Sequence, residues 1–134
     1  MTIFRTDAFR TSIMNAQNTA IGTSCLIQAR TGAPAGSGGQ GTLIAQLTGN
    51  ASAFGVVSNG VLTSNAITQD SSADATGTVA HYELLTSGAV FLESGILNEA
   101  GTDGLSIDNA DVNAGQVVQF NGNWVRTAAY DDGV

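Results

Sequence analysis

The chain has 134 residues, of which 43% are hydrophobic and 11% are charged, a composition that predicts one folded domain rather than a disordered segment. Eleven acidic residues against four arginines and no lysine give a formal net charge of −7, which argues against binding to nucleic acid or to an anionic membrane. No basic and apolar leader and no run of about 18 apolar residues occurs, so we expect neither export by a signal peptide nor a membrane span.

Helical periodicity is confined to the start of the chain. Thr6 or Asp7 is expected to cap a helix over residues 7–21. Gly22 suits the position just past the helix end, where a left-handed backbone is common. We expect the apolar stripe of this helix to pack across a sheet or against a neighbouring subunit. Its members, at the spacing i, i+4, i+7 and i+11, are Phe9, Ile13, Ala16 and Ala20.

From residue 24 onward the hydrophobic pattern alternates, which is typical of strands. Strands are predicted over residues 24–30 and 42–48. Cys25 is the single cysteine, which excludes an internal disulfide and a cysteine-based structural zinc site. Because aliphatic residues follow it directly, we expect Cys25 to be a small buried side chain.

A glycine-rich segment, residues 31–41, connects these two strands and predicts a flexible surface loop that orders against a partner. Gly36, Gly38 and Gly41 match the spacing G-x-G-x-x-G of dinucleotide-binding loops. That mechanism needs a helix N-terminus after the glycines to hold the pyrophosphate, and a strand is predicted here instead. We therefore expect no nucleotide, and the sequence indicates no other cofactor.

Short strands separated by turn residues make up most of the remaining chain. They are predicted at 61–64 and 66–68, and then over 76–86 and 90–97. Residues 76–86 alternate strictly, which predicts a strand with one buried and one exposed face. A turn at 87–88 would lead into the return strand of a hairpin.

Asn121-Gly122 lies between two apolar segments near the C-terminus. Asn-Gly is the strongest short hairpin signal, because both central residues of a type I′ turn need positive φ. A hairpin over residues 116–127 is predicted, followed by a loose tail over 128–134. The whole pattern predicts a single mainly β domain over residues 1–134, an antiparallel β-sandwich or a Greek-key or jelly-roll-like barrel with one N-terminal α-helix.

No catalytic motif stands out. His81 is the sole histidine, and Glu83 would lie on the same strand face. No activated nucleophile accompanies them, so we expect an exposed or interfacial polar pair and no enzyme activity.

Two other groups of side chains suggest ligands. Asp103, Asp108 and Asp111 carry the oxygen ligands that calcium prefers, but their spacing is not that of an EF-hand, so we interpret them as solvated loop residues and expect no metal. Trp124 and Phe120 suit either the core or an aromatic binding platform. In a carbohydrate-binding β module, Trp124, Tyr82 and Asp111 would contact the sugar.

Several turn-and-strand segments that follow the predicted helix together resemble small virion proteins of tailed bacteriophages. The resemblance covers residues 7–110, and the terminal hairpin and tail depart from it. The segments that carry it are residues 29–34, 41–47, 53–55, 59–61, 65–68 and 73–78.

The resemblance implies a virion structural protein that is assembled in the host bacterial cytoplasm. The expected role is that of a capsid decoration or cement protein, a homotrimer that binds the major capsid protein or other virion proteins of the assembled shell. A neck or tail component, such as a collar or short fibre, and a carbohydrate-binding β module are the alternatives. Contacts with a partner are expected in the N-terminal segment, the glycine-rich loop and the C-terminal region. The candidate residues are Arg5, Arg10, Gly36, Gly38, Gly39, Arg126 and Tyr130.

Overall fold

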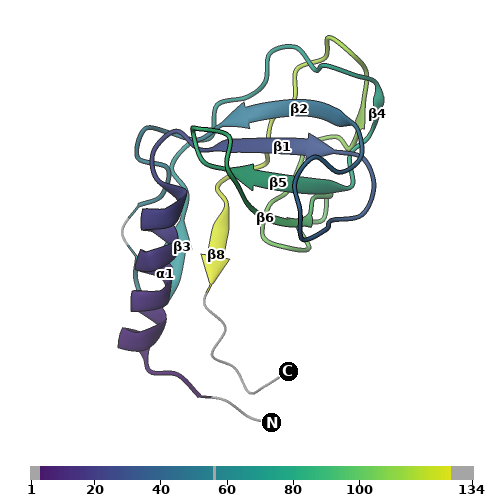
Figure 1. Ribbon diagram of the computed structural model, residues 1–134. Helices are drawn as coiled ribbons and strands as arrows, with labels where there is room; N and C mark the ends of the chain where they lie inside the picture. Colours follow the sequence, from purple (N-terminus) through teal and green to yellow (C-terminus); the bar gives the residue numbers. More distant parts are fainter. Residues whose placement is uncertain (1–3, 56, 128–134) are drawn as a thin grey trace.

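The computed structural model describes residues 4–55 and 57–127, and these residues form a mainly β structure with one N-terminal helix (Figure 1). The expected antiparallel, sandwich-like β fold is confirmed. Within the described residues no helix has the length and apolar character needed to cross a membrane. The elements are α1 (Asp7–Ile21), β1 (Leu26–Arg30), β2 (Leu43–Thr48), β3 (Val61–Thr63), β4 (Gly77–Thr78), β5 (His81–Leu85), β6 (Phe91–Ile96), β7 (Asp111–Val112) and β8 (Val125–Thr127).

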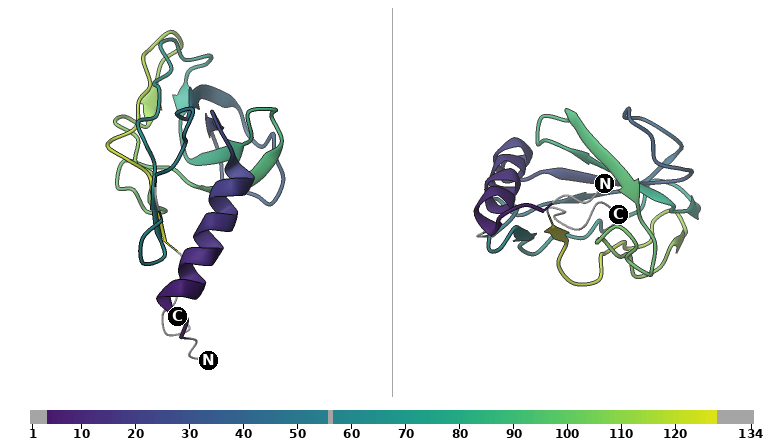
Figure 2. Two further views of the ribbon diagram at one scale, coloured as in Figure 1. Left: turned by 90° about the vertical axis from the view of Figure 1, so that its left-hand side faces the viewer. Right: turned by 90° about the horizontal axis from the view of Figure 1, so that it is seen from below.

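A four-stranded antiparallel sheet in the order β2-β1-β5-β6 forms one layer of the molecule. The two-stranded ribbons β3–β8 and β4–β7, joined by loops, form the other layer, which the right-hand view of Figure 2 shows opposite the sheet. Because side chains alternate along a strand, each strand of the sheet sends every second residue into the core between the layers. The core includes Ile27, Ile44, Leu47, Leu62, Leu84, Leu97, Leu105, Ile107 and Trp124.

Helix α1 spans the predicted residues, but it buries a different face. Thr6 is the N-cap, and its Oγ1 accepts a hydrogen bond from Phe9 N at 3.2 Å. The expected packing of this stripe across the sheet is wrong for Phe9, whose side chain is exposed, while packing against a neighbouring subunit stays a prediction. Ala16 and Ala20 are exposed as well, and only Ile13 of the predicted stripe is partly buried. The buried residues of the helix are Arg10, Met14 and Ile21, one position further along the chain.

The helix is rotated toward the β3–β8 ribbon, which lies beside it in Figures 1 and 2. Gly60 N, just before β3, donates to Thr11 Oγ1 at 3.2 Å. Arg10 lies against the backbone of Gly60, and Gln17 bonds to Arg126 of β8. A stripe defined by hydropathy alone misses a helix face that buries Arg10 and directs Gln17 into a polar contact.

This rotation predicts different effects for truncation of Met14 and of Phe9. Met14→Ala is expected to lower the free energy of unfolding by about 2–5 kcal/mol, because it leaves a cavity in the core. Phe9→Ala is expected to change it by no more than about 0.5 kcal/mol, because Phe9 lies on the surface. Urea denaturation of both variants measures the difference. A larger loss for Phe9→Ala than for Met14→Ala would contradict this helix orientation.

The Asn-Gly hairpin lies at a different place from the one predicted. Asn59 and Gly60 both have positive φ, of 51° and 72°, and Ser58 and Val61 exchange two backbone hydrogen bonds across them. This is the geometry of a type I′ turn. Asn59-Gly60 therefore closes a tight hairpin at the start of β3.

The predicted hairpin over residues 116–127 is wrong. Val118 forms a bridge with Asp70 and Phe120 forms one with Ile107, while β8 pairs with β3. Asn121 is not among the residues with positive φ, and its Nδ2 donates to Ile107 O at 3.2 Å. The two halves of the predicted hairpin therefore find partners elsewhere, because those pairings bury Val118 and Trp124 in the common core.

The predicted strand over residues 76–86 is divided between two sheets. Its first part, β4, pairs with β7, and its second part, β5, lies in the middle of the four-stranded sheet. All five residues of β5 are buried, so the expectation of one exposed face is wrong. The predicted hairpin of β5 with β6 is confirmed, and the predicted strand at 66–68 is reduced to one bridge between Thr48 and Thr68.

Both edges of the four-stranded sheet are hydrogen-bonded to a loop aspartate. Gln46 N on β2 donates to Asp70 Oδ2 at 2.9 Å, and Ile96 N on β6 donates to Asp103 Oδ2 at 2.8 Å. Open sheet edges invite pairing with strands of other chains. The two carboxylates occupy backbone donors that such a strand would need, and so they oppose sheet extension between molecules.

Candidate functional site

Polar side chains gather on the outer face of the four-stranded sheet, the face turned away from the common core. Glu83 of β5 lies opposite Gln28 of β1 on one side and Ser94 of β6 on the other. Arg30 lies opposite His81 in the next cross-strand pair. The glycine-rich β1–β2 connection, residues 31–41, covers this group, and we name it the strap.

The strap is bonded to the outer face near both of its ends. Gly39 N and Gln40 N donate to Glu83 Oε1 and Oε2 at 2.8 and 3.0 Å. His81 Nδ1 lies 2.8 Å from Gly32 O, and Arg30 Nη1 donates to Gln40 O at 3.2 Å. The sequence predicted a flexible arm, whereas the structure shows a loop that folds back and is anchored on buried side chains.

The glycine motif of the strap serves close packing. Gly38 lies so near Phe91 that an added Cβ would be 3.2 Å from that side chain. The backbone of Gly39 and Gln40 holds a carboxylate, as anion-binding loops do, but the carboxylate belongs to Glu83 of the same chain. Gly38 and Gly41 of this motif therefore have a structural role, whereas Gly36 has no atom within 4 Å of an added Cβ.

Glu83 is an ionised, buried group with several donors around it. Burial by itself raises the pKa of this carboxyl, but hydrogen bonds from Gly39 N and Gln40 N, then His81 and the charge of Arg30, lower it below its usual range. His81 and Glu83 have relative exposures of 0% and 1%. The prediction of an exposed or interfacial pair is therefore wrong: the strap covers both side chains.

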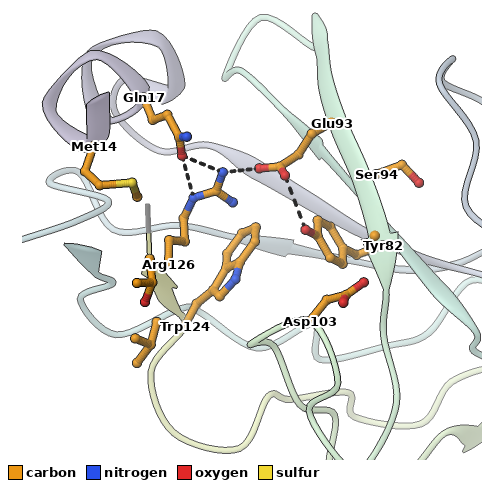
Figure 3. Close-up of a pocket in the computed structure, with 11 residues that line it drawn as sticks. Met14, Gln17, Tyr82, Glu93, Ser94, Asp103, Trp124 and Arg126 are labelled. Carbon is orange, nitrogen blue, oxygen red and sulfur yellow. Dashed lines mark hydrogen bonds and ion pairs between the residues drawn. The ribbon is translucent and has the colours of Figure 1, made fainter. Parts of the chain in front are cut away.

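A second group of polar and aromatic side chains lines a hollow of about 330 Å³ between α1, β6 and β8 (Figure 3). The guanidinium of Arg126 lies between Gln17 and Glu93, as Figure 3 shows. It donates to Gln17 Oε1 at 2.9 Å and forms an ion pair with Glu93. This bridge ties the helix to the edge strand of the sheet.

The floor of this hollow is aromatic. Arg126 Cζ lies 4.8 Å from the centre of the Trp124 ring, a cation–π contact. Tyr82 meets the same ring edge to face at 5.0 Å, and Phe54 packs on it at 5.9 Å. Burial, and then the nearby Glu93 carboxylate, raise the pKa of the Tyr82 hydroxyl well above its usual range. Tyr82 therefore stays protonated and donates toward Glu93 Oε2 at 3.4 Å.

The structure distributes the predicted partner-contact residues over different environments. Gly36, Gly38 and Gly39 lie on the exposed outer surface of the strap, and Arg5 is partly exposed just before α1. Arg10 and Arg126 are largely buried: Arg10 pairs with Asp7, and Arg126 pairs with Glu93. Tyr130 and the tail over 128–134 lie outside the described residues.

The predicted sugar platform does not form. Trp124 and Tyr82 have relative exposures of 1% and 4%, and the face of Trp124 carries Arg126. Asp111 lines a separate hollow beside β4, where it accepts a hydrogen bond from Thr78 Oγ1 at 2.8 Å. Phe120 is partly buried against the core. A pyranose ring needs an open aromatic face, and these residues do not provide one.

The acidic loop residues are separated as well. Asp103 caps the edge of β6 and Asp111 bonds to Thr78, while among the described residues no three His, Cys, Asp or Glu side chains gather closely enough to hold a metal ion. Cys25 is buried, as predicted, and burial raises the pKa of its thiol. The Cys25 thiol is therefore a packed core group.

Sequence reasoning did not single out Arg30, Gln17 or Glu93. A charged residue within an otherwise apolar strand is a usable signal, because charges are almost never buried without a partner. Arg30 and Glu83 meet this criterion on their strands. Gln17 offers no comparable signal, because its role depends on the direction in which β8 runs past the helix.

Comparison with known proteins gives no relative for this chain. No protein-family model matches it, and no match is found among curated proteins or among solved structures.

Proposed function

We propose that this chain is a virion structural protein of a tailed bacteriophage, a decoration or cement protein that binds the assembled capsid shell. The proposal rests on the resemblance of residues 7–110 to such proteins and on one structural observation. The side chains able to do chemistry, His81, Glu83 and Arg126, are engaged in internal bonds, whereas large apolar side chains are exposed at the start of α1. This distribution favours adhesion over catalysis.

The exposed apolar side chains supply a contact surface. Phe4 and Phe9 have relative exposures of 79% and 55%, and both lie near the end of α1 that extends beyond the four-stranded sheet (Figures 1 and 2). Burying an aromatic side chain of this size contributes about 1.5–3 kcal/mol. The outer surface of the strap, around Ala35, offers a second contact surface, exposed and with small side chains, on a loop that is anchored at Gly32, Gly39 and Gln40.

A cement protein stabilises a shell by mass action. If it binds the assembled shell and not the free subunits, its binding free energy adds to the stability of the shell. A homotrimer would repeat the same patch around a shell axis, and several linked weak contacts would raise the overall affinity. The aspartates bonded to both sheet edges agree with binding as a closed trimer, because they disfavour open-ended strand pairing between copies.

The test is co-sedimentation of the purified chain with empty shells of the virion that contains it. We expect binding at a fixed stoichiometry, and we expect Phe9→Ser to weaken it at least about tenfold, since an aromatic contact is lost. Ala35→Arg should also weaken binding if the strap is a contact, while Ala114→Arg is the matched control at another exposed alanine. Absence of the chain from purified particles would overturn the proposal, and a few copies per particle would indicate a neck or tail component instead.

A further inference from the structure

The contacts of His81 under the strap indicate which of its ring nitrogens carry a hydrogen. Gly32 O is a carbonyl and only accepts, so His81 Nδ1, at 2.8 Å, must carry a hydrogen. The other ring nitrogen, Nε2, lies 3.4 Å from Glu83 Oε2. In a neutral ring with its hydrogen on Nδ1, Nε2 would present a lone pair to a carboxylate. The closed arrangement is therefore favourable only when a second proton lies between His81 and Glu83.

A neutral His81 can donate a hydrogen bond to only one of its two neighbours, Gly32 O or Glu83 Oε2. With its hydrogen on Nδ1, the ring keeps its hydrogen bond to Gly32 O, and the lone pair of Nε2 repels the Glu83 carboxylate. With its hydrogen on Nε2, the ring donates to Glu83, and the lone pair of Nδ1 repels Gly32 O. The imidazolium can donate to both, because each of its nitrogens carries a hydrogen. Loss of one proton therefore either breaks the anchor at Gly32 or places the Nε2 lone pair against Glu83, the carboxylate that accepts from Gly39 N and Gln40 N.

The other groups around His81 do not replace this proton. Among the described residues, Arg30 of β1 is the further charged group in contact with the pair, with its Nε 3.4 Å from Glu83 Oε1. Residues 31–41 contain no charged side chain. β6 contributes Ser94, whose buried Oγ has no hydrogen-bond partner within the described part of the chain, while Glu93 points to the hollow of Figure 3 on the opposite face.

We propose that the strap is a proton-dependent clasp, closed when a doubly protonated His81 bridges Gly32 O and the Glu83 carboxylate, and loosened when His81 loses a proton. The closed state binds one more proton than the open state with neutral His81, so closure is favoured at low pH and is lost as the pH rises. The bonds of Gly39 and Gln40 require ionised Glu83, and the hydrogen bonds that it accepts lower its pKa and so favour that ionised form. Opening of the strap would expose His81, Glu83 and Arg30 to solvent together.

Nuclear magnetic resonance of the whole chain tests the clasp between pH 5 and pH 9, the range that brackets histidine titration. Amide exchange of Gly39 and Gln40, corrected for the intrinsic effect of pH, is expected to become about tenfold faster from pH 5 to pH 9, the effect of losing one hydrogen bond to a charged group. The ring ¹⁵N shifts of His81 should change from imidazolium to neutral as the protection of the strap is lost.

Glu83→Gln removes the carboxylate that shares the proton, so exchange in the strap is expected to be fast and, after correction, nearly independent of pH. Asp103→Asn is the matched control, because it makes the same change in another carboxylate that accepts a backbone N–H; it should keep the pH dependence of the strap. The wild-type titration decides the matter even if Glu83→Gln fails to fold. Strap protection that does not change with pH, or ¹⁵N shifts of a neutral His81 while the strap is protected, would overturn the proposal.

Discussion

Replacement of Trp124 by alanine is expected to lower the free energy of unfolding by about 3–5 kcal/mol, the range for removal of a large buried aromatic side chain. Trp124 lies where α1, the four-stranded sheet and β8 meet, and its ring contacts Tyr82, Phe54 and Arg126. Loss of the ring would leave a cavity and would also remove the surface on which the Arg126 guanidinium rests. The bridge from Gln17 to Glu93 would then lose its support.

Urea denaturation followed by far-ultraviolet circular dichroism measures this loss. Val125→Ala is the control, because the neighbouring side chain is exposed and its truncation should change the free energy of unfolding by no more than about 0.5 kcal/mol. Trp124→Phe should fall between the two, since it keeps an aromatic ring in the core. A loss below about 1 kcal/mol for Trp124→Ala would show that the ring is not the centre of this packing.

Gly41→Ala is the second substitution for which we expect a large effect, a loss of about 3 kcal/mol or more in the free energy of unfolding. Gly41 has a φ of +64°, a conformation that costs about 1–2 kcal/mol for any residue with a Cβ. A Cβ at this position would also lie 1.9 Å from Thr31 O, so the backbone must move. That movement would separate Thr42 N from Thr31 Oγ1, which are 2.9 Å apart just before β2.

Gly36→Ala is the matched control within the same strap. Gly36 has no positive φ and no atom within 4 Å of an added Cβ, so we expect a change of no more than about 0.5 kcal/mol. The same denaturation experiment compares the two variants, and the amide signals of Gly39 and Gln40 report whether the strap has moved. Equal stability of both variants would contradict a folded strap and would support the flexible loop that the sequence suggested.

Local patterns predicted several elements of this chain. The cap at Thr6, the alternation of β1 and β2, and the turn between β5 and β6 depend on residues that are close in sequence, so they were predicted from the sequence alone. The candidate site was predicted less well. His81 and Glu83 were identified as a pair, but their burial depends on a strap, residues 31–41, that lies far from them along the chain.

The amino-acid sequence by itself determined the mainly β character, the extent of the helix and the identity of Cys25 as a packed side chain, because propensity, capping and hydrophobic period act over a few residues. Only the tertiary structure decided which face α1 buries, which Asn-Gly pair forms a type I′ turn and which strand β8 joins. Those choices depend on how much apolar surface is buried, and which polar bonds form, when distant segments meet. Asn59-Gly60 and Asn121-Gly122 carry the same local signal, and the core formed around Trp124 selects between them.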